Sequence, residues 1–371
     1  MLSDADALLR LALVPGLTPT VAQRLLDACA SPAEAFTWSM DRLHGIEGLG
    51  GDVARRICDH RGDEQLAAER AACHRAGVRI LVRTDADYPQ ALLVLEDAPL
   101  AIWIKGELQP RDRLALAVVG SRRPSAYGHR QAHRLSIGMA QVGTTLVAGL
   151  DRGIDTVAHT AALEGGARTI AVLGSGFGRL YPDENTPLAA RIADGRGAVL
   201  SELPFTASPS ATTFPRRNRL IAALTLATLV IEAGTRDGAL VTARLSMELG
   251  RDVLVVPGNI DNPECTGSNQ LIRDGATLVA SVEHILQEVE PLLTLAGGAI
   301  ALDGAKPLGP RASALTGREK QVYLMLADAP RTIADLVRVG EVPHSAVSAT
   351  LLSLELRRLV RRLPEGYVRA T

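Results

Sequence analysis

The sequence has few aromatic residues and almost no lysine. Phe, Trp and Tyr make up 3 % of the 371 residues, so any hydrophobic core must be mostly aliphatic. Lysine occurs only at Lys105, Lys306 and Lys320, and arginine carries nearly all of the positive charge. The formal net charge of −1 excludes a global attraction to nucleic acid, so a site for an anionic polymer needs local clustering of arginine. The planar guanidinium suits phosphate, although genomic base composition explains an arginine bias equally well.

Other features are missing as well. The four cysteines, Cys29, Cys58, Cys73 and Cys265, lack the spacing of a metal site. No apolar run approaches the roughly 20 residues that a membrane-spanning helix needs, and the first residues do not resemble a signal peptide. We therefore expect a reduced, cytoplasmic protein with no metal, no cofactor and no membrane partner.

Residues 1–76 show a helical pattern that two glycine hairpins interrupt, at residues 14–17 and 46–50. This form is typical of helix-hairpin-helix or SAM-like domains, because glycine permits the tight turn and exposes backbone N–H groups. Such a domain either contacts DNA phosphates or recruits protein partners. The balanced charge of the flanking segments slightly favours the second role. No tandem repeat is evident.

Residues 77–290 alternate between strand and helix patterns. The predicted strands are residues 80–82, 100–104, 114–119, 145–147, 169–173, 198–200, 228–231 and 253–256. Several are continuous apolar runs, as in parallel strands that are buried on both faces. Their order predicts an α/β fold, a doubly wound Rossmann-like sheet (extended Rossmann) that binds ligands at the carboxyl ends of its strands.

The last segments differ again. Residues 291–312, rich in Gly, Ala and Pro, predict a linker. Residues 313–371 predict a winged helix, with helices at 318–326, 333–337 and 345–359 and a hairpin at 361–368. The third helix carries its positive charge at the far end, in Arg357, Arg358, Arg361 and Arg362, where it is poorly placed to read bases. We expect weak, sequence-independent contacts to duplex DNA, or protein contacts.

Glycine-rich turns follow several of the predicted strands. In the first, Gly120-Ser121-Arg122-Arg123 leads toward a helix, which leaves backbone N–H groups free to bind an anion. Arg122 adds a fork for phosphate, and Ser121 adds a hydroxyl donor. The other interpretation is a tight strand-to-helix turn without a ligand.

A second turn contains Gly149, Arg152 and Gly153. Asp155 follows in a position suited to cap the next helix. His159 has no partner Ser or Cys pattern, so a structural hydrogen bond is favoured over catalysis.

A third turn contains Gly174, Ser175, Gly176 and Arg179. Its glycines suggest a dinucleotide-binding loop at first sight. That fingerprint fails, because Tyr181-Pro182 interrupts the point where the helix would start.

The sharpest signal is the run Phe214-Pro215-Arg216-Arg217-Asn218-Arg219, which lies just before an apolar helix pattern. Arginines between buried elements need partners, either internal carboxylates or an anionic ligand. A later turn adds Gly238. So many turns at one sheet edge favour the phosphate backbone of single-stranded DNA over a single small anion.

These motifs, in this order, resemble the DNA-processing protein A (DprA/Smf) family. The matching segments are residues 120–128, 149–155, 174–182, 214–219, 232–240 and 256–258. The flanking regions resemble the SAM-like and winged-helix modules of many members. Asp151 stands where the family often has alanine, and Gly178-Arg179 where it often has an acidic residue followed by an apolar or basic one. These departures leave the details of the DNA path open.

The resemblance implies a homodimer, formed through the Rossmann domain, that binds and protects single-stranded DNA and loads RecA recombinase onto it during natural transformation. The apolar residues Leu271, Ile272, Leu278 and Val279 belong either to the dimer interface or to the core. No catalytic residue is implied. The predicted DNA-binding residues are Gly120, Ser121, Arg122, Arg123, Gly149, Arg152, Gly153, Gly174, Ser175, Gly176, Arg179, Phe214, Arg216, Arg217, Asn218, Arg219 and Gly238.

Two other functions compete with this one. The first is an enzyme of a related Rossmann type, such as a nucleotide phosphoribohydrolase. Its Pro-Gly-Gly-x-Gly-Thr-x-x-Glu segment is lacking at residues 232–238. The second is a transcription factor led by the winged helix, which would bind duplex DNA sequence-specifically.

Overall fold

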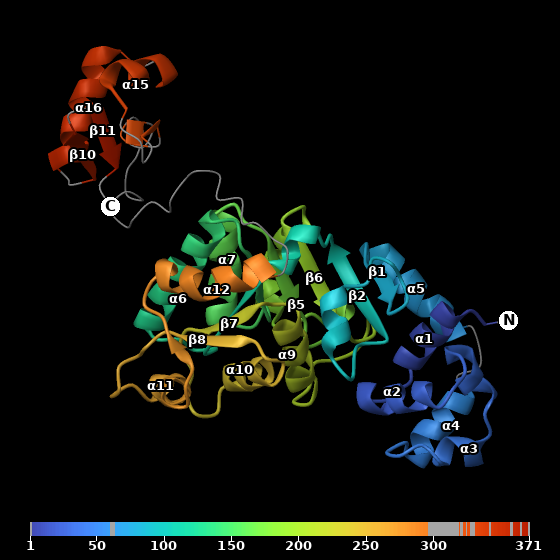
Figure 1. The fold of residues 1–371 in the computed structure, drawn as a ribbon. Coiled ribbons are helices and arrows are strands. Elements are labelled where there is room, and N and C mark those ends of the chain that lie inside the picture. The colour runs from blue at the N-terminus through green and yellow to red at the C-terminus, as the bar shows by residue number, and fades with distance from the viewer. Residues whose placement is uncertain are drawn as a thin grey trace. The chain divides into compact units, whose positions relative to one another are not determined.

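The computed structural model describes residues 2–59 and 64–295 and parts of the C-terminal region, namely 319, 322–323, 325–326, 331–340, 343–356, 359–363 and 366–369. The chain divides into two compact units, residues 1–298 and 299–371 (Figure 1). Residues 291–295 of the predicted linker form the end of a helix that begins at Val282. From residue 296 on, the predicted linker lies outside the described residues, as does most of the predicted helix at 318–326. The predicted domain boundaries at 76/77 and 290/291 stay predictions.

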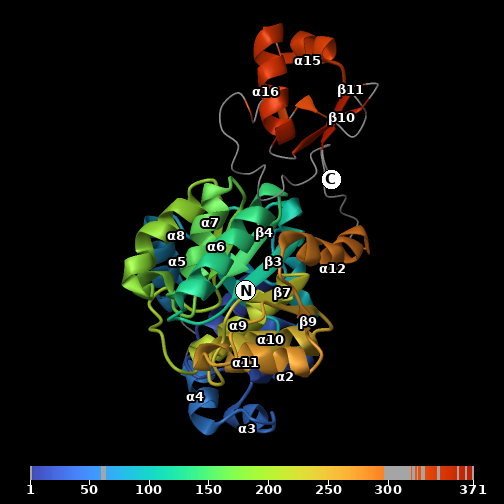
Figure 2. The same ribbon diagram turned by 90° about the vertical axis from the view of Figure 1, so that its left-hand side faces the viewer.

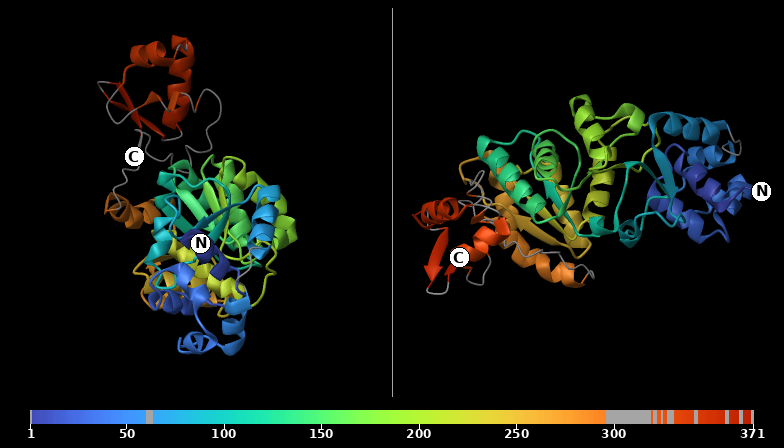
Figure 3. Two further views of the ribbon diagram at one scale, coloured as in Figure 1. Left: turned by 90° about the vertical axis from the view of Figure 1, so that its right-hand side faces the viewer. Right: turned by 90° about the horizontal axis from the view of Figure 1, so that it is seen from above.

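Five short helices open the first unit: α1 (Asp4–Ala12), α2 (Pro19–Asp27), α3 (Met40–His44), α4 (Gly51–Asp59) and α5 (Glu64–Ala76). Their apolar faces form one core with residues of the first two strands, among them Val82, Ala101 and Trp103. The buried carboxylate of Glu69 on α5 accepts hydrogen bonds from Trp103 Nε1 (2.7 Å) and from the backbone N–H of Phe205 (2.6 Å). The helices therefore pack against the sheet edge and share its interior, as the N-terminal end of the chain in Figure 3 shows.

The two glycine hairpins are copies of one unit. Residues 14–17 correspond to residues 46–49, and the pair Val21 and Arg24 corresponds to Val53 and Arg56. Arg56 Nη1 donates to the carbonyl oxygen of residue 15 (2.7 Å), and Arg24 Nη1 donates to that of residue 47 (3.1 Å). Each copy thus closes the hairpin of the other. This repeat was not predicted from the sequence, because few other positions of the two copies match.

Nine strands form the main sheet: β1 (Arg79–Val82), β2 (Ala101–Gly106), β3 (Ala115–Val119), β4 (Thr145–Ala148), β5 (Thr169–Val172), β6 (Gly197–Ser201), β7 (Ala227–Val230), β8 (Asp252–Val255) and β9 (Thr277–Leu278). Their order is β1-β2-β6-β5-β4-β3-β7-β8-β9. The block β6-β5-β4-β3-β7-β8-β9 is parallel throughout. Strand β2 pairs antiparallel with β1 and with β6. All eight predicted strands are confirmed, and only the two-residue β9 was not predicted.

Helices cover both faces of this sheet. On one face lie α6 (Ala126–Gln141), α7 (Ile154–Glu164) and α8 (Thr186–Ala193). On the other lie α9 (Thr213–Ala223), α10 (Gly238–Glu248) and α11 (Thr266–Arg273), and α12 (Val282–Leu295) packs beside α6 (Figure 2). The chain moves outward from β3 to β6 and then returns to β7, so the strand order reverses between β3 and β7. The doubly wound Rossmann-like fold is confirmed.

The second unit has its own small core, built around Val322, Leu336, Val347, Leu351 and Leu354. Helices α15 (Ile333–Gly340) and α16 (His344–Leu356) precede an antiparallel hairpin of β10 (Val360–Leu363) and β11 (Gly366–Arg369). This order is that of a winged helix. Arg357 and Arg358 and the side chain of Arg362 lie outside the described residues.

No helix in the described ranges is long and apolar enough to cross a membrane.

Candidate nucleic-acid interface

A pocket of about 390 Å³ opens at the carboxyl edge of the sheet, beside the reversal of strand order. Its walls come from the loops after β3 and β4 and from the starts of α9 and α10. The charged and polar side chains that line it are those of Arg122, Asp151, Asp155, Arg217, Asn218, Arg236, Asp237 and Thr242, with Phe214 as the aromatic member. Open α/β sheets bind ligands in the crevice at this point. The pocket therefore lies at the edge where the sequence predicts a site.

The turn after β3 is held firmly by its neighbours. The backbone N–H of Ser121 donates to the carbonyl oxygen of Glu232 (2.7 Å). The Ser121 hydroxyl accepts from the N–H of Arg123 (3.1 Å) and donates to Glu264 (3.3 Å). Ser125 caps α6, and its own N–H and hydroxyl donate to the buried Glu232 carboxylate. Ser121 is thus engaged inside the protein, while the side chain of Arg122 is 53 % exposed.

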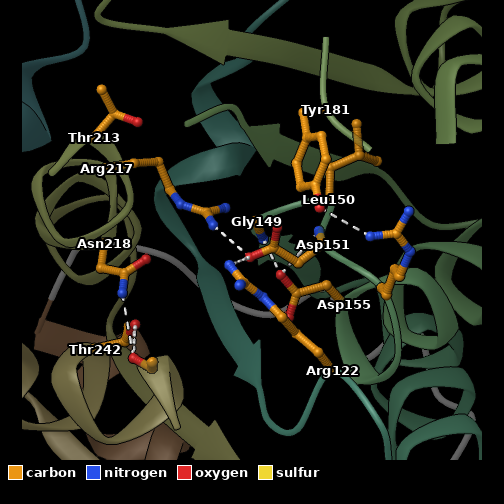
Figure 4. A network of polar contacts seen from close by, with 12 residues as sticks. Arg122, Gly149, Leu150, Asp151, Asp155, Tyr181, Thr213, Arg217, Asn218 and Thr242 are labelled. Atoms are coloured by element: carbon orange, nitrogen blue, oxygen red, sulfur yellow. Dashed lines mark hydrogen bonds and ion pairs between the residues drawn. The ribbon is translucent and has the colours of Figure 1, made fainter. Parts of the chain in front are cut away.

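The Asp151 carboxylate accepts hydrogen bonds from two arginines beside this turn (Figure 4). Its Oδ2 atom accepts from Arg122 Nη2 (2.9 Å) and from Arg217 Nη2 (2.8 Å). Arg217 is 4 % exposed and also donates to the carbonyl oxygen of Val172 (2.8 Å). The Cζ atom of Arg122 lies 4.7 Å from the centre of the Phe214 ring, close enough for a cation–π contact. This arrangement presents one half-exposed guanidinium over an aromatic ring.

The expectation that Asp155 caps α7 is wrong. The helix begins at Ile154 with no side-chain cap, and Asp155 lies in its first turn. The Asp155 carboxylate instead accepts from the backbone N–H groups of Gly149 (2.9 Å) and Asp151 (3.3 Å). Burial raises the pKa of Asp155, and the neighbouring negative charge of Asp151 raises it further. Asp155 therefore shapes the loop that carries Asp151.

His159 is buried within α7, away from solvent. Its Nδ1 atom lies 2.7 Å from Thr169 Oγ1, and that hydroxyl donates its only proton to the carbonyl oxygen of Leu146 (2.8 Å). The Nδ1 atom must therefore carry the proton of the neutral ring. Burial lowers the pKa of His159 to about 3. The geometry agrees with the structural role that the sequence favours.

The glycines of the predicted turns meet protein atoms at close range. A Cβ atom at Gly149 would overlap the guanidinium of Arg217, and one at Gly174 would press on the ring of Phe214. A Cβ at Gly176 would overlap the carbonyl oxygen of Pro204. Gly153 has a φ of +75° and approaches the backbone of Ser121 and Arg122. These glycines position Arg217, Arg122 and the Phe214 ring. Gly238 also borders the pocket, but a Cβ atom there would meet only Asn218 Nδ2, at 3.9 Å.

The arginine run occupies the first turns of α9, and the apolar pattern that follows it forms the rest of the helix. A helix from Thr213 includes the run because Pro215 tolerates a position in the first turn. Arg216 forms an ion pair with Glu202, and Arg219 pairs with Glu202 (2.6 Å) and Asp97 (3.3 Å). Asn218 Nδ2 donates to the carbonyl oxygen of Gly238 (3.2 Å) and so ties α9 to α10. Arg216 and Arg219 are therefore paired with carboxylates away from the pocket lining.

Other charged side chains reach the surface around the pocket. Arg123, Arg179 and Arg236 are exposed, and the described part of the chain offers their guanidinium groups no ion pair. Arg152 pairs with Glu184 (2.8 Å) and donates to the Tyr181 hydroxyl (3.0 Å). Tyr181 meets Phe214 edge to face, with ring centres 6.2 Å apart. Arg236 and Tyr181 were not selected from the sequence, although both lie in turns that the motifs singled out.

Comparison with known proteins decides the family. The family described as DNA recombination-mediator protein A matches residues 79–290, more than half of the chain. The chain belongs to this family. The DprA winged helix domain matches residues 306–366, in agreement with the predicted C-terminal fold. The resemblance to the DprA/Smf family is therefore confirmed.

Curated relatives and solved structures agree with this assignment. Protein Smf of Escherichia coli K12 is 39 % identical over 298 residues, which cover 78 % of this chain and 77 % of the relative. The X-ray structure of DNA processing protein A from Streptococcus pneumoniae aligns with a TM-score of 0.65 and 32 % identity, over 77 % of this chain and 98 % of that one. A Helicobacter pylori homologue, described for its single-stranded DNA binding mode, aligns with a TM-score of 0.51 and 26 % identity, over 58 % of this chain and 96 % of that one.

Proposed function

We propose that this protein binds single-stranded DNA at the carboxyl-edge pocket and acts in recombination without catalysing a reaction itself. The observation that carries the proposal is the half-exposed guanidinium of Arg122, stacked on Phe214 at the rim of the pocket. A cation beside an aromatic ring offers one partner for a phosphate and one for a base, which is the combination that single-stranded sites use. The Helicobacter pylori relative with a described single-stranded DNA binding mode supports the same assignment.

Within the predicted set, we assign two kinds of role. The exposed arginines Arg122, Arg123, Arg152 and Arg179, joined by Arg236, contact phosphates. The buried members hold these groups in place through the hydrogen bonds and ion pairs described above. The pocket lining carries aspartates as well as arginines, so its interior attracts phosphate only weakly. Contacts between phosphates and the exposed arginines at the rim therefore supply most of the affinity for DNA.

The first test is the substitution of Arg122 by alanine. The variant should bind a thymidine oligonucleotide at least about tenfold more weakly, because a charge-assisted contact to phosphate is lost. The plot of log affinity against log salt should flatten by a slope of about 0.7. Fluorescence anisotropy at several salt concentrations measures both quantities.

Arg191→Ala is the matched control, because Arg191 is exposed in the last turn of α8, where that helix leads to the amino edge of the sheet. It should leave binding almost unchanged. Wild-type affinity in a folded Arg122→Ala variant removes Arg122 from the site. Base release from nucleoside monophosphates by the wild type would instead support the phosphoribohydrolase alternative.

The bound strand is then passed to RecA recombinase, as the family resemblance implies. We expect the protein to shorten the lag in RecA-dependent ATP hydrolysis on single-stranded DNA that is precoated with single-strand-binding protein. The Arg122→Ala variant should lose this effect together with its DNA affinity. A protein that binds the strand but leaves the lag unchanged contradicts the loading role and not the binding role.

We also propose that the protein forms a homodimer through the Rossmann domain. Of the four candidate residues, Val279 is buried and Leu271 and Ile272 pack against the core, whereas Leu278 is 48 % exposed on the edge strand β9. A large exposed apolar residue on an open sheet edge favours contact with another chain.

Leu278→Asp should therefore shift the protein toward monomer in light scattering at micromolar concentration. Val94→Asp, at an equally exposed position in the 3₁₀ turn Gln90–Val94, serves as the control and should not. A wild-type monomer under these conditions contradicts the dimer. A Leu278→Asp dimer moves the interface elsewhere.

A further inference from the structure

The pocket contains an acidic residue at the point where a bound phosphate would be attracted most strongly. Asp151 Oδ2 accepts from both Arg122 (2.9 Å) and Arg217 (2.8 Å). Figure 4 shows its carboxylate between the two guanidinium groups. A single oxygen with two charge-assisted donors is the arrangement that these arginines would offer to a phosphate oxygen. The protein thus supplies its own anion to the site.

The backbone around Asp151 is fixed in a way that keeps the carboxylate there. The preceding Leu150 has a φ of 62°, in the left-handed region that residues other than glycine rarely adopt, and its side chain is completely buried. Asn185 Nδ2 donates to the carbonyl oxygen of Leu150 (2.8 Å), and Thr156 Oγ1 donates to that of Asp151 (2.7 Å). With the N–H of Asp151 bound to Asp155 (3.3 Å), these contacts hold both sides of the residue.

The two arginines differ in how much of their charge is available. Arg217 is 4 % exposed and donates to Val172 as well, so its charge is used inside the protein. Arg122 is 53 % exposed, and only its Nη2 atom is engaged by Asp151. A phosphate can therefore reach Arg122, but it must approach the Asp151 carboxylate at the same time.

We propose that Asp151 is an internal competitor for the DNA phosphate and that it limits the affinity of the site for single-stranded DNA. This inference rests on the proposed DNA binding at Arg122. Asp151 lowers the positive charge that a phosphate meets, and it orients Arg122 without contributing a favourable contact to the ligand. The strand is bound more weakly, and with a smaller dependence on salt, than the arginines of the pocket would give alone. Such a site releases its strand readily.

Asp151→Asn tests the proposal, because asparagine has the same shape and its amide oxygen can still accept from either arginine. Binding of a fluorescent thymidine oligonucleotide should become about tenfold tighter at low salt, since one negative charge is removed a few Å from the phosphate. The salt plot should steepen by a slope of about 0.7, which corresponds to one more phosphate contact. Thermal melting checks that the variant is folded. If it is not, Asp151→Ser is used, whose hydroxyl and vacated space let water solvate Arg217.

Two further variants distinguish a local effect of Asp151 on DNA affinity from the effect of removing one negative charge anywhere on the protein. Asp183→Asn removes the same charge from an exposed acid in the nearby 3₁₀ turn Asp183–Asn185 and should change the affinity by less than about twofold. In the double variant Arg122→Ala/Asp151→Asn, the gain should vanish, because Asp151 acts through Arg122.

Three results overturn the proposal: affinity equal to or below wild type in a folded Asp151 variant, an equal gain from Asp183→Asn, or a gain that survives the loss of Arg122. Failure of the wild type to bind the oligonucleotide refutes the proposed function itself, which is a separate outcome.

Discussion

Replacing Arg168 by methionine should lower the free energy of unfolding of the first unit by about 3–5 kcal/mol. The side chains of Arg168 and Asp112 are 5 % and 6 % exposed, and two hydrogen bonds of 2.8 Å join the guanidinium to both carboxylate oxygens. The Nη2 atom of Arg168 also donates to the carbonyl oxygen of Glu107 (2.5 Å). Methionine leaves the Asp112 carboxylate buried without its counter-charge, and that loss is the main cost.

Chemical denaturation followed by tryptophan fluorescence measures this effect. Both tryptophans, Trp38 and Trp103, belong to the first unit, so the signal does not include the winged helix. The double variant Arg168→Met/Asp112→Asn should recover most of the lost stability, because no buried charge remains and the introduced amide oxygen can still accept a hydrogen bond. A single variant as stable as the wild type would mean that the pair contributes nothing.

Replacing Gly149 by alanine should lower the free energy of unfolding by about 3 kcal/mol or more and weaken binding of single-stranded DNA at least about tenfold. The added methyl group would overlap the guanidinium of Arg217 and push it away from Asp151 and Val172. Asp151 would then pair with Arg122 alone, and the floor of the pocket would change shape. Denaturation and fluorescence anisotropy measure the two effects on one preparation.

Gly238→Ala is the matched control, because Gly238 borders the same pocket but has no neighbour closer to an added Cβ than Asn218 Nδ2, at 3.9 Å. The free energy of unfolding of this variant should stay within about 0.5 kcal/mol of the wild-type value. Equal behaviour of the two alanine variants would show that Arg217 can move without loss.

The strands and the turns that follow them could be predicted from the sequence, because continuous apolar runs such as β3 report burial on both faces. The family motifs identified the sheet edge at which the pocket lies for the same reason: each is a turn at the end of a parallel strand. The partners of the arginines could not be predicted. Arg217 meets Asp151 across 66 residues, and Arg219 meets Glu202 across 17, and no local pattern indicates which acid faces which arginine.

The run at residues 214–219 illustrates this limit. From the sequence, its arginines are either ligand contacts or internal ion pairs. The fold brings Glu202 and Asp97 against Arg219, and Asp151 against Arg217. The arginines that are most conspicuous in the sequence are therefore buried in internal ion pairs. The exposed cations instead lie in turns, at Arg122 and Arg236, where a single arginine gives little signal in a sequence rich in arginine.

The shared core of α1–α5 with β1 and β2 affects how the chain folds during synthesis. Helix α5 leaves the ribosome early, but the backbone N–H that Glu69 binds belongs to Phe205, 136 residues later. At roughly 5–20 residues per second, translation needs roughly ten seconds to supply that donor. Trp103, which the helices cover, follows only 34 residues after Glu69, but until Phe205 is made the Glu69 carboxylate lacks one of its two donors. The N-terminal helices are therefore made first, but the last hydrogen bond that fixes them to the rest of the first unit forms only after most of the sheet has been synthesised.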